Sequence, residues 1–190
     1  MCKRWLVTIL LLGLCSRVPA SEPDSVARGE AAFFEGNTLD YVIQPPRGFR
    51  MFHQDSLMDD YSFFFIPDTL EYAEADILIG VNVFSLHGVE FEQVLSADTI
   101  ALRKHYGVTM DLWPVDSITT AGGSLFRTYY INDQSRFIPN VMVSYFDGGT
   151  ELLILELVIS ESALRVKAEE RFLACLRNVK VLARGELDHR

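Results

Sequence analysis

Cysteine and recognisable catalytic motifs are scarce in this chain of 190 residues. Of its three cysteines, Cys2 and Cys15 fall in the first fifteen residues, so Cys175 stands alone in the remainder. One cysteine cannot close an internal disulfide, which excludes the small disulfide-stapled class of secreted proteins. Cys175 lies among apolar residues with helical spacing, and we expect a buried hydrophobic side chain there rather than a nucleophile.

Motifs for nucleotide binding and for serine hydrolysis are also missing. The chain has no Walker loop, no dinucleotide-binding glycine motif, no Cys-x-x-Cys pair and no Gly-x-Ser-x-Gly elbow. The glycine pairs Gly122-Gly123 and Gly148-Gly149 are better explained as hairpin turns than as phosphate cradles. We therefore expect neither an enzyme nor a resident cofactor.

Basic residues are outnumbered, with 17 Lys and Arg against 26 Asp and Glu, a net charge of −9. This acidic balance argues against a nucleic-acid partner. Hydrophobic residues make up 49% of the chain and aromatic residues 12%, which excludes intrinsic disorder. The length suits one domain with a substantial core.

The first twenty residues have the three parts of a secretory signal. Basic Lys3-Arg4 precedes an apolar run over 5–15, and Val18-Pro19-Ala20 places small residues before polar Ser21. The apolar run of 11 residues is shorter than the roughly 20 that a membrane-spanning helix needs. We expect cleavage between Ala20 and Ser21, with a retained membrane anchor as the alternative.

Loss of this segment removes three basic residues and no acidic one, which takes the net charge from −9 to −12. The mature chain is then expected to have no membrane span, and to reach the periplasm of a Gram-negative bacterium or the exterior. A lipoprotein acylated at Cys15 is a further alternative. Bulky Leu14 stands before that cysteine, where lipoprotein signals prefer a small residue.

Short runs of branched and aromatic residues predict β-strands in the first half of the chain. The expected strands cover 41–44, 61–66 and 75–86. Pro45-Pro46 stops the first of them, and Arg47-Gly48-Phe49 then predicts a turn.

The second half predicts two helices and two hairpins. Apolar residues at helical spacing indicate a helix over 89–106, ended by Gly107. A second helix is expected to begin near Ser160, a favourable N-cap, and to bury Leu164, Ala168 and Phe172. The predicted hairpins join 116–121 to 125–131, and 140–146 to 150–159.

Both faces of the strand over 151–159 are mostly apolar, so both should be covered. The sequence therefore predicts an α+β fold, a mainly antiparallel sheet flanked by helices as an α/β/α sandwich. The expected boundaries are a flexible lead-in over 21–38, one globular domain over 39–182 and a polar tail over 183–190.

The element order and a few local runs carry a family resemblance. They are the run Tyr41-Val42-Ile43-Gln44-Pro45-Pro46-Arg47-Gly48-Phe49, the strand 77–84, and the closing strand 152–160 with the helix that bears Phe172, Leu176 and 179–182. Over 39–182 the chain resembles the PsbP-like superfamily, which includes the photosystem extrinsic subunit, Mog-type Ran-binding import factors and periplasmic DcrB-like proteins. The resemblance implies a sandwich, usually non-catalytic, that holds a partner. Its motifs are signatures of a fold, so no functional residue is carried over.

The densest polar cluster lies in the loop predicted over 51–60. His53, Asp55 and Asp59 are the candidate metal ligands, although a solvated acidic loop explains this spacing as well. Apolar residues rimmed by these acids would suit a protein-binding site. They are Met51, Phe52, Leu57 and Met58.

Arg127 and Tyr129 are further candidates for partner binding. With Tyr130 and Arg136-Phe137, they place cationic and aromatic side chains on one hairpin, where they could clamp a ligand. Ordinary cross-strand pairing is the competing explanation.

Three functions remain open on these residues. The chain is interpreted first as a secreted or periplasmic non-catalytic accessory protein that acts through its surface on a protein partner. The first alternative is a metal-dependent or hydrolytic enzyme that uses His53, Asp55 and Asp59. The second is a secretion-associated chaperone or immunity protein.

Overall fold

The fold is built on two antiparallel sheets, which the computed structural model describes over residues 31–52, 62–106, 109–133, 141–160 and 162–184. The larger sheet has eight strands in the order β3-β4-β5-β10-β9-β8-β6, with β7 paired to β8. Its strands are β3 (Phe49–Phe52), β4 (Phe63–Pro67), β5 (Ile77–Ser85), β6 (Met110–Pro114), β7 (Ile118–Thr119), β8 (Leu125–Asp133), β9 (Val141–Asp147) and β10 (Glu151–Ile159).

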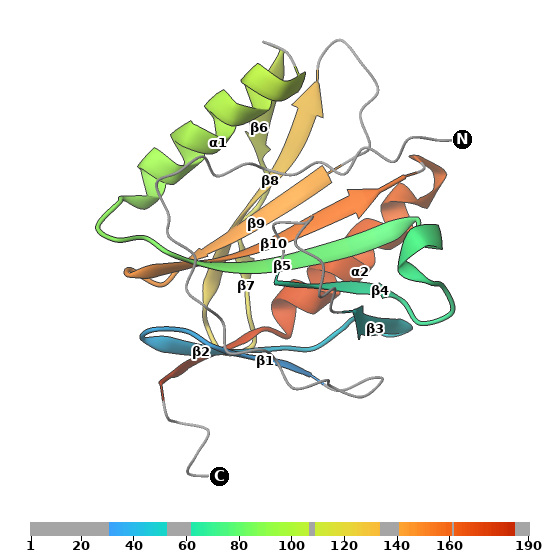
Figure 1. Ribbon diagram of the computed structural model, residues 1–190, viewed down its shortest axis with the longest axis horizontal. Helices are drawn as coiled ribbons and strands as arrows, with labels where there is room; N and C mark the ends of the chain where they lie inside the picture. The colour runs from blue at the N-terminus through green and yellow to red at the C-terminus, as the bar shows by residue number, and fades with distance from the viewer. Residues whose placement is uncertain (1–30, 53–61, 107–108, 134–140, 161, 185–190) are drawn as a thin grey trace.

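Helix α1 (Phe91–Tyr106) covers one face of this sheet, and α2 (Arg165–Arg177) lies against the other (Figure 1). A three-stranded sheet packs with α2 in one apolar cluster, and consists of β1 (Ala32–Glu35), β2 (Leu39–Ile43) and β11 (Lys180–Ala183). The short helices η1 (Tyr72–Glu74) and η2 (Ser162–Leu164) complete the described elements. No helix in these ranges has the length and apolar character needed to cross a membrane.

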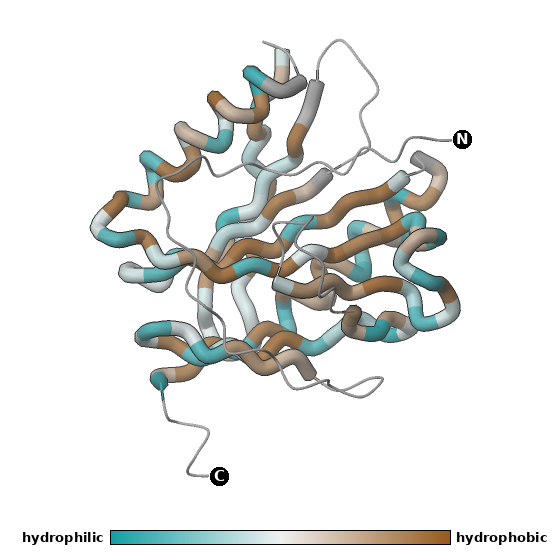
Figure 2. Tube along the Cα trace, viewed as in Figure 1, coloured by the Kyte–Doolittle hydropathy of each residue, from teal (hydrophilic) through white to brown (hydrophobic). Residues whose placement is uncertain are grey.

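Strand β10 is the centre of the large sheet and is buried on both faces, as its sequence predicts. It pairs with β5 along its whole length and with β9 from Leu152 to Leu157. Its odd-numbered leucines pack with α2, and Leu152 and Ile154 pack with α1. Hydrophobic residues accordingly dominate the central strands, and hydrophilic residues gather at turns and on outer helix surfaces (Figure 2). The predicted α+β fold with a mainly antiparallel sheet is confirmed.

The two predicted hairpins and both helices are also found, but several boundaries differ. The expected lead-in over 21–38 contains β1, which pairs with β2 from Ala32 to Glu35. The turn predicted at 47–49 ends at Gly48, whose φ is +80°, because Phe49 is buried and starts β3. Strands β6 and β11 are not among the predicted elements, and β11 extends one residue into the expected polar tail.

The second helix begins at Arg165, five residues later than expected. Ser160 does not cap it, because its hydroxyl donates to the Asp76 carboxylate at 2.9 Å. This bond joins the end of β10 to the residue that precedes β5, so the favourable capping residue closes the sheet instead.

Candidate functional site

Most of the loop that carries the candidate metal ligands, over 53–61, is not among the described residues. His53, Asp55 and Asp59 lie outside the described residues, as do Leu57 and Met58. In the part of the chain that is described, no three His, Cys, Asp or Glu side chains converge as a metal-binding group.

Met51 and Phe52 belong to β3, the edge strand of the large sheet, and are half-buried. The Phe52 ring stacks on Tyr72 with centroids 5.0 Å apart and planes at 4°. Phe52 and Tyr72 pack against the cluster that includes Phe64 and Ile66. The Phe52 ring therefore packs within an aromatic cluster, and only part of it is accessible to a partner.

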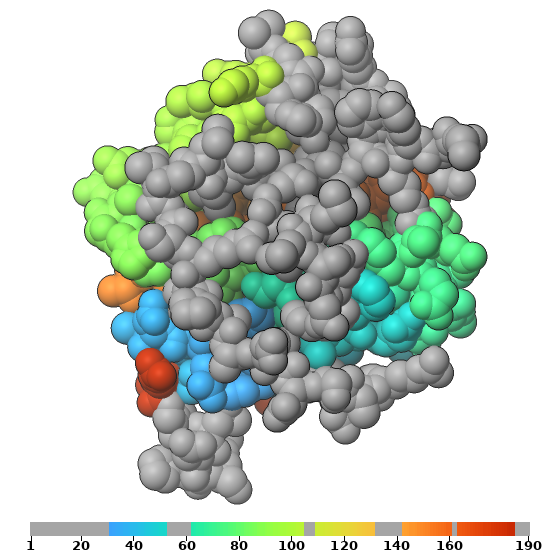
Figure 3. Space-filling model, in the orientation of Figure 1, coloured from blue at the N-terminus to red at the C-terminus, as the bar shows by residue number. Residues whose placement is uncertain are grey.

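An open hollow of about 460 Å³ lies where the chain enters β3. Proline rings, a phenylalanine, and polar and charged residues line it. These lining residues are Pro45, Pro46, Arg47, Gly48, Phe49, Arg50, Asp68 and Thr69. Atoms of β3, β4 and the segment that follows them, coloured cyan to teal, reach the surface in Figure 3. The hollow therefore lies at the edge of the sheet, where a partner could approach.

Backbone hydrogen bonds fix the two walls of the hollow to each other. The Phe49 N–H donates to the Pro46 carbonyl, and the Asp68 N–H donates to the Gly48 carbonyl, each at 3.0 Å. Arg50 is largely buried, and its Nη2 donates to the Leu70 carbonyl at 3.1 Å. The shape is consequently set by proline rings and main-chain bonds, and binding here would order few additional groups.

Helix α2 contacts Phe49, one of the residues that line this hollow. The Arg171 guanidinium carbon lies 5.3 Å from the centroid of the Phe49 ring, one of the lining side chains. One turn later, the Cys175 thiol donates to the Gln44 carbonyl at 3.3 Å, just before the proline pair. Burial raises the pKa of the Cys175 thiol to about 12, so it is protonated at neutral pH, in agreement with a structural cysteine.

Arg127 and Tyr129 lie far along the sheet order from β3, on the face that α1 covers. Arg127 Nη1 donates to Glu92 Oε1 at 2.6 Å, and its guanidinium carbon lies 4.6 Å from the Phe91 ring centroid. Tyr129 packs edge-on against Tyr145 at 5.9 Å. The structure therefore does not bring these two residues together with Met51 and Phe52 as one surface.

Tyr130 belongs to the opposite face, because neighbouring residues of a strand alternate. Its hydroxyl donates to Glu169 Oε2 at 3.0 Å, and the Arg165 guanidinium carbon lies 5.1 Å from its ring. The aromatic and cationic residues of β8 thus join the sheet to both helices, while 136–137 lie outside the described residues.

The same α1 interface contains buried acids that no site motif in the sequence marks. Asp98 on α1 is fully buried and accepts a hydrogen bond from the Tyr145 hydroxyl at 2.8 Å. Its Oδ1 has no hydrogen-bond partner within the described ranges. Glu156 of β10 is also buried and adds to the negative field at Tyr145.

Burial raises the pKa of the Asp98 carboxyl to about 6, and the Tyr145 hydrogen bond only partly opposes this. Burial and the Asp98 carboxylate in turn raise the pKa of Tyr145. A sequence signal for Asp98 exists: it occupies the i+7 position of the apolar stripe begun by Phe91, Val94 and Leu95. An acidic residue at such a position predicts a buried carboxyl group rather than a solvent-exposed one.

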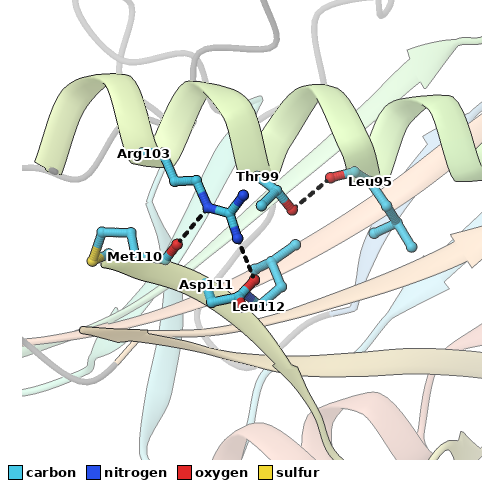
Figure 4. A network of polar contacts seen from close by, with 6 residues as sticks. All are labelled: Leu95, Thr99, Arg103, Met110, Asp111 and Leu112. Carbon is cyan, nitrogen blue, oxygen red and sulfur yellow. Dashed lines mark hydrogen bonds and ion pairs between the residues drawn. The ribbon is translucent and has the colours of Figure 1, made fainter. Parts of the chain in front are cut away.

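Polar contacts attach the other end of α1 to β6, as Figure 4 shows. Arg103 Nε donates to the Met110 carbonyl at 3.0 Å, and its Nη2 lies 3.5 Å from Asp111 Oδ1. Within α1, the Thr99 hydroxyl donates to the Leu95 carbonyl at 2.9 Å. The helix is thus fixed by exposed polar contacts at its end and by a buried acid at its middle.

No protein-family model and no curated protein sequence matches this chain. Solved structures do. The solution structure of cyanobacterial PsbP (CyanoP) from Synechocystis sp. PCC 6803 matches with a TM-score of 0.53 at 10% identity, over 83% of this chain and 96% of that one. The crystal structure of LpqN, involved in cell envelope biogenesis of Mycobacterium tuberculosis, matches with a TM-score of 0.54 at 11% identity, over 78% and 86%. These likenesses show that the chain has the PsbP-like fold that its sequence predicts.

Proposed function

We propose that this protein is a non-catalytic accessory protein of the cell envelope, which binds a protein partner at the hollow beside β3. The observation that carries the proposal is the construction of the hollow. Its walls are prolines and hydrogen-bonded main chain, and charged side chains stand at its rim. A preformed concave site of this kind can bind a partner segment with little loss of conformational entropy.

The extracytoplasmic location is supported by the sequence and by the fold. A basic start, a short apolar run and a small-residue end up to Ala20 are typical of a secretory signal. One protein with the same fold, LpqN, is described as acting in cell envelope biogenesis. We propose the periplasm of a Gram-negative bacterium as the location, with the chain processed between Ala20 and Ser21.

Site-specific photocrosslinking in the producing cells tests the binding surface. A photoreactive phenylalanine analogue would replace Thr69 at the rim of the hollow, and in a matched strain Lys104 on the exposed surface of α1. We expect an adduct of discrete mass from position 69 and none from position 104. Equal adducts at both positions, or none at position 69, would overturn the proposal.

The location is tested separately by fractionation. The full chain should appear in the periplasmic fraction about 20 residues shorter than its translated length. A chain that starts at Ser21 should remain in the cytoplasm. Retention of the full-length chain in the membrane fraction would favour the retained anchor instead.

A further inference from the structure

The charge of the chain is unevenly distributed over its fold. Over residues 162–184, which contain α2 and β11, six side chains are basic and two are acidic. The whole chain, in contrast, has a net charge of −9. The basic residues of this segment are Arg165, Lys167, Arg171, Arg177, Lys180 and Arg184. The segment that forms α2 and β11 is therefore basic within an acidic chain.

Part of this positive charge is already used by contacts within the fold. Arg165 Nε donates to Glu169 Oε1 at 2.6 Å, and the same glutamate accepts from Tyr130. These two helix residues lie on the flank of α2 that faces β8. Their charges balance each other and leave little for a partner.

The other flank of α2 carries charge that no acid in the described residues neutralises. Lys167 and Arg171 are spaced i,i+4 and so lie on one side of the helix. Arg171 packs over Phe49 at the hollow, whose rim also carries exposed Arg47. Across the described ranges, none of these three side chains forms an ion pair.

In the described part of the chain, the acidic groups near this surface are fewer, and they are exposed. Asp68 lines the hollow, and Glu170 lies on the solvent side of α2. Arg50, the second arginine of the hollow, is bonded to Leu70 and lies 3.5 Å from Glu71 Oε2. Among the described residues, three cations stand against two acids, which leaves this part of the surface positive, and Asp68 offers an acceptor for a donor of the partner.

We propose that Arg47, Lys167 and Arg171, together with the hollow, form a basic docking surface for an acidic segment of a protein partner. This inference rests on the proposed function and names the chemistry of the partner. Charge complementarity with the surface selects glutamate- and aspartate-rich chain, and a long-range field speeds its encounter. The concave, proline-walled hollow suits a peptide side chain, whereas a flat bilayer could not reach its floor.

Fluorescence anisotropy with a labelled peptide of alternating glutamate and glycine tests the surface. The chain from Ser21 should bind this peptide, with an affinity that falls as salt is raised. The double variant Arg47→Glu/Lys167→Glu should bind at least tenfold more weakly. Lys104→Glu reverses one exposed lysine on α1 and is the matched control for the single variant Lys167→Glu; it should change the affinity less than twofold.

Three outcomes would overturn the inference. They are no binding by the unmodified protein, an equal loss in Lys104→Glu and Lys167→Glu, and tighter binding to phosphatidylglycerol vesicles than to the peptide with the same residue dependence. Melting temperatures of all variants should agree within a few degrees, because the substituted side chains carry no ion pair. A crosslink at position 69 that survives Arg47→Glu/Lys167→Glu would overturn the acidic partner alone and leave the proposed function standing.

Discussion

Each face of the large sheet buries a carboxylate beneath its covering layer, and the two are stabilised in opposite ways. On the α2 face, Glu151 accepts hydrogen bonds from the main-chain N–H groups of Asn37 and Leu39 at 2.7 and 2.9 Å, and from the Thr38 hydroxyl at 3.3 Å. On the α1 face, Asp98 accepts one, from Tyr145. Both side chains are fully buried.

The difference teaches what each face can do. The Glu151 carboxylate holds the turn between β1 and β2 against the sheet. The donors of that turn compensate the cost of burying the carboxylate. Asp98 lacks such compensation and holds its proton up to a pH of about 6. We therefore expect the stability of the α1 layer to depend on pH more strongly than that of the α2 layer.

The largest expected effect comes from opening the core of the α2 face. Phe172 is fully buried against the sheet, and Phe172→Ala should cost about 4 kcal/mol of unfolding free energy. Denaturant titration measures this cost. Val166→Ala on the same helix is the control, because Val166 is 70% exposed, and it should cost less than about 0.5 kcal/mol. Similar costs for both would contradict the packing of α2.

Removal of the Glu151 charge should have the next largest effect. In Glu151→Gln an NH₂ group replaces one of the two carboxylate oxygens, so a donor faces the donors of residues 37–39. The substitution should lower the free energy of unfolding by about 3 kcal/mol in the same titration. Glu35→Gln, on the exposed side of β1, should change stability by less than about 0.5 kcal/mol. A neutral result for Glu151→Gln would show that the β1–β2 turn does not need the carboxylate.

A smaller and pH-dependent effect is expected at Asp98. Its folded-state pKa of about 6 exceeds the ordinary aspartate value of 3.8, so the protonated form stabilises the folded state below pH 4. That stabilisation is lost as the pH rises through 6, by an amount on the order of 2 kcal/mol. Asp98→Asn should therefore reduce the fall in unfolding free energy between pH 4.5 and pH 7.5.

The control for this effect is Asp111→Asn, which neutralises an exposed acid beside α1 and should leave the pH dependence as it is. Tyr145 contacts Asp98 from the sheet, and Glu156 in turn acts on Tyr145. Tyr145→Phe removes the hydrogen bond that opposes the shift, so it should steepen the pH dependence. An Asp98→Asn protein with an unchanged profile would contradict the buried proton.

The smallest effect is expected at the exposed end of α1. Arg103→Ala removes the bond to the Met110 carbonyl and the contact with Asp111, both at the surface, and should cost about 0.5 kcal/mol. Thermal unfolding at low and high salt measures it. A cost as large as that of Glu151→Gln would show that α1 is held mainly by its polar end.

Much of the fold could be predicted from local patterns. The hairpin of β9 and β10 follows from two apolar runs around Asp147-Gly148-Gly149, and α1 follows from its apolar spacing before Gly107. The small sheet could be predicted only in part. Its strand β2 matches the strand predicted over 41–44, whereas β11 is short and pairs across the chain, as Lys180 does with Val42, so no local pattern marks it.

The candidate site was predictable only in part. The sequence predicts that Pro45-Pro46 ends a strand and that a turn follows at 47–49, but the role of this run as a wall of the hollow depends on Asp68 and Thr69, some twenty residues away. Contact of Arg171 with Phe49 likewise depends on the position of α2. The i,i+4 spacing of Lys167 and Arg171 predicts a positive flank of α2. The contact of that flank with the residues of the hollow cannot be predicted from the spacing.

Hydrogen exchange at pH 5 and pH 7.5, corrected for the intrinsic pH dependence of exchange, tests the contrast between the two faces most directly. We expect the opening free energy of α1 amides to fall by on the order of 2 kcal/mol between these conditions. Amides of α2 should keep theirs. Equal changes in both helices, or no change in α1, would contradict the account.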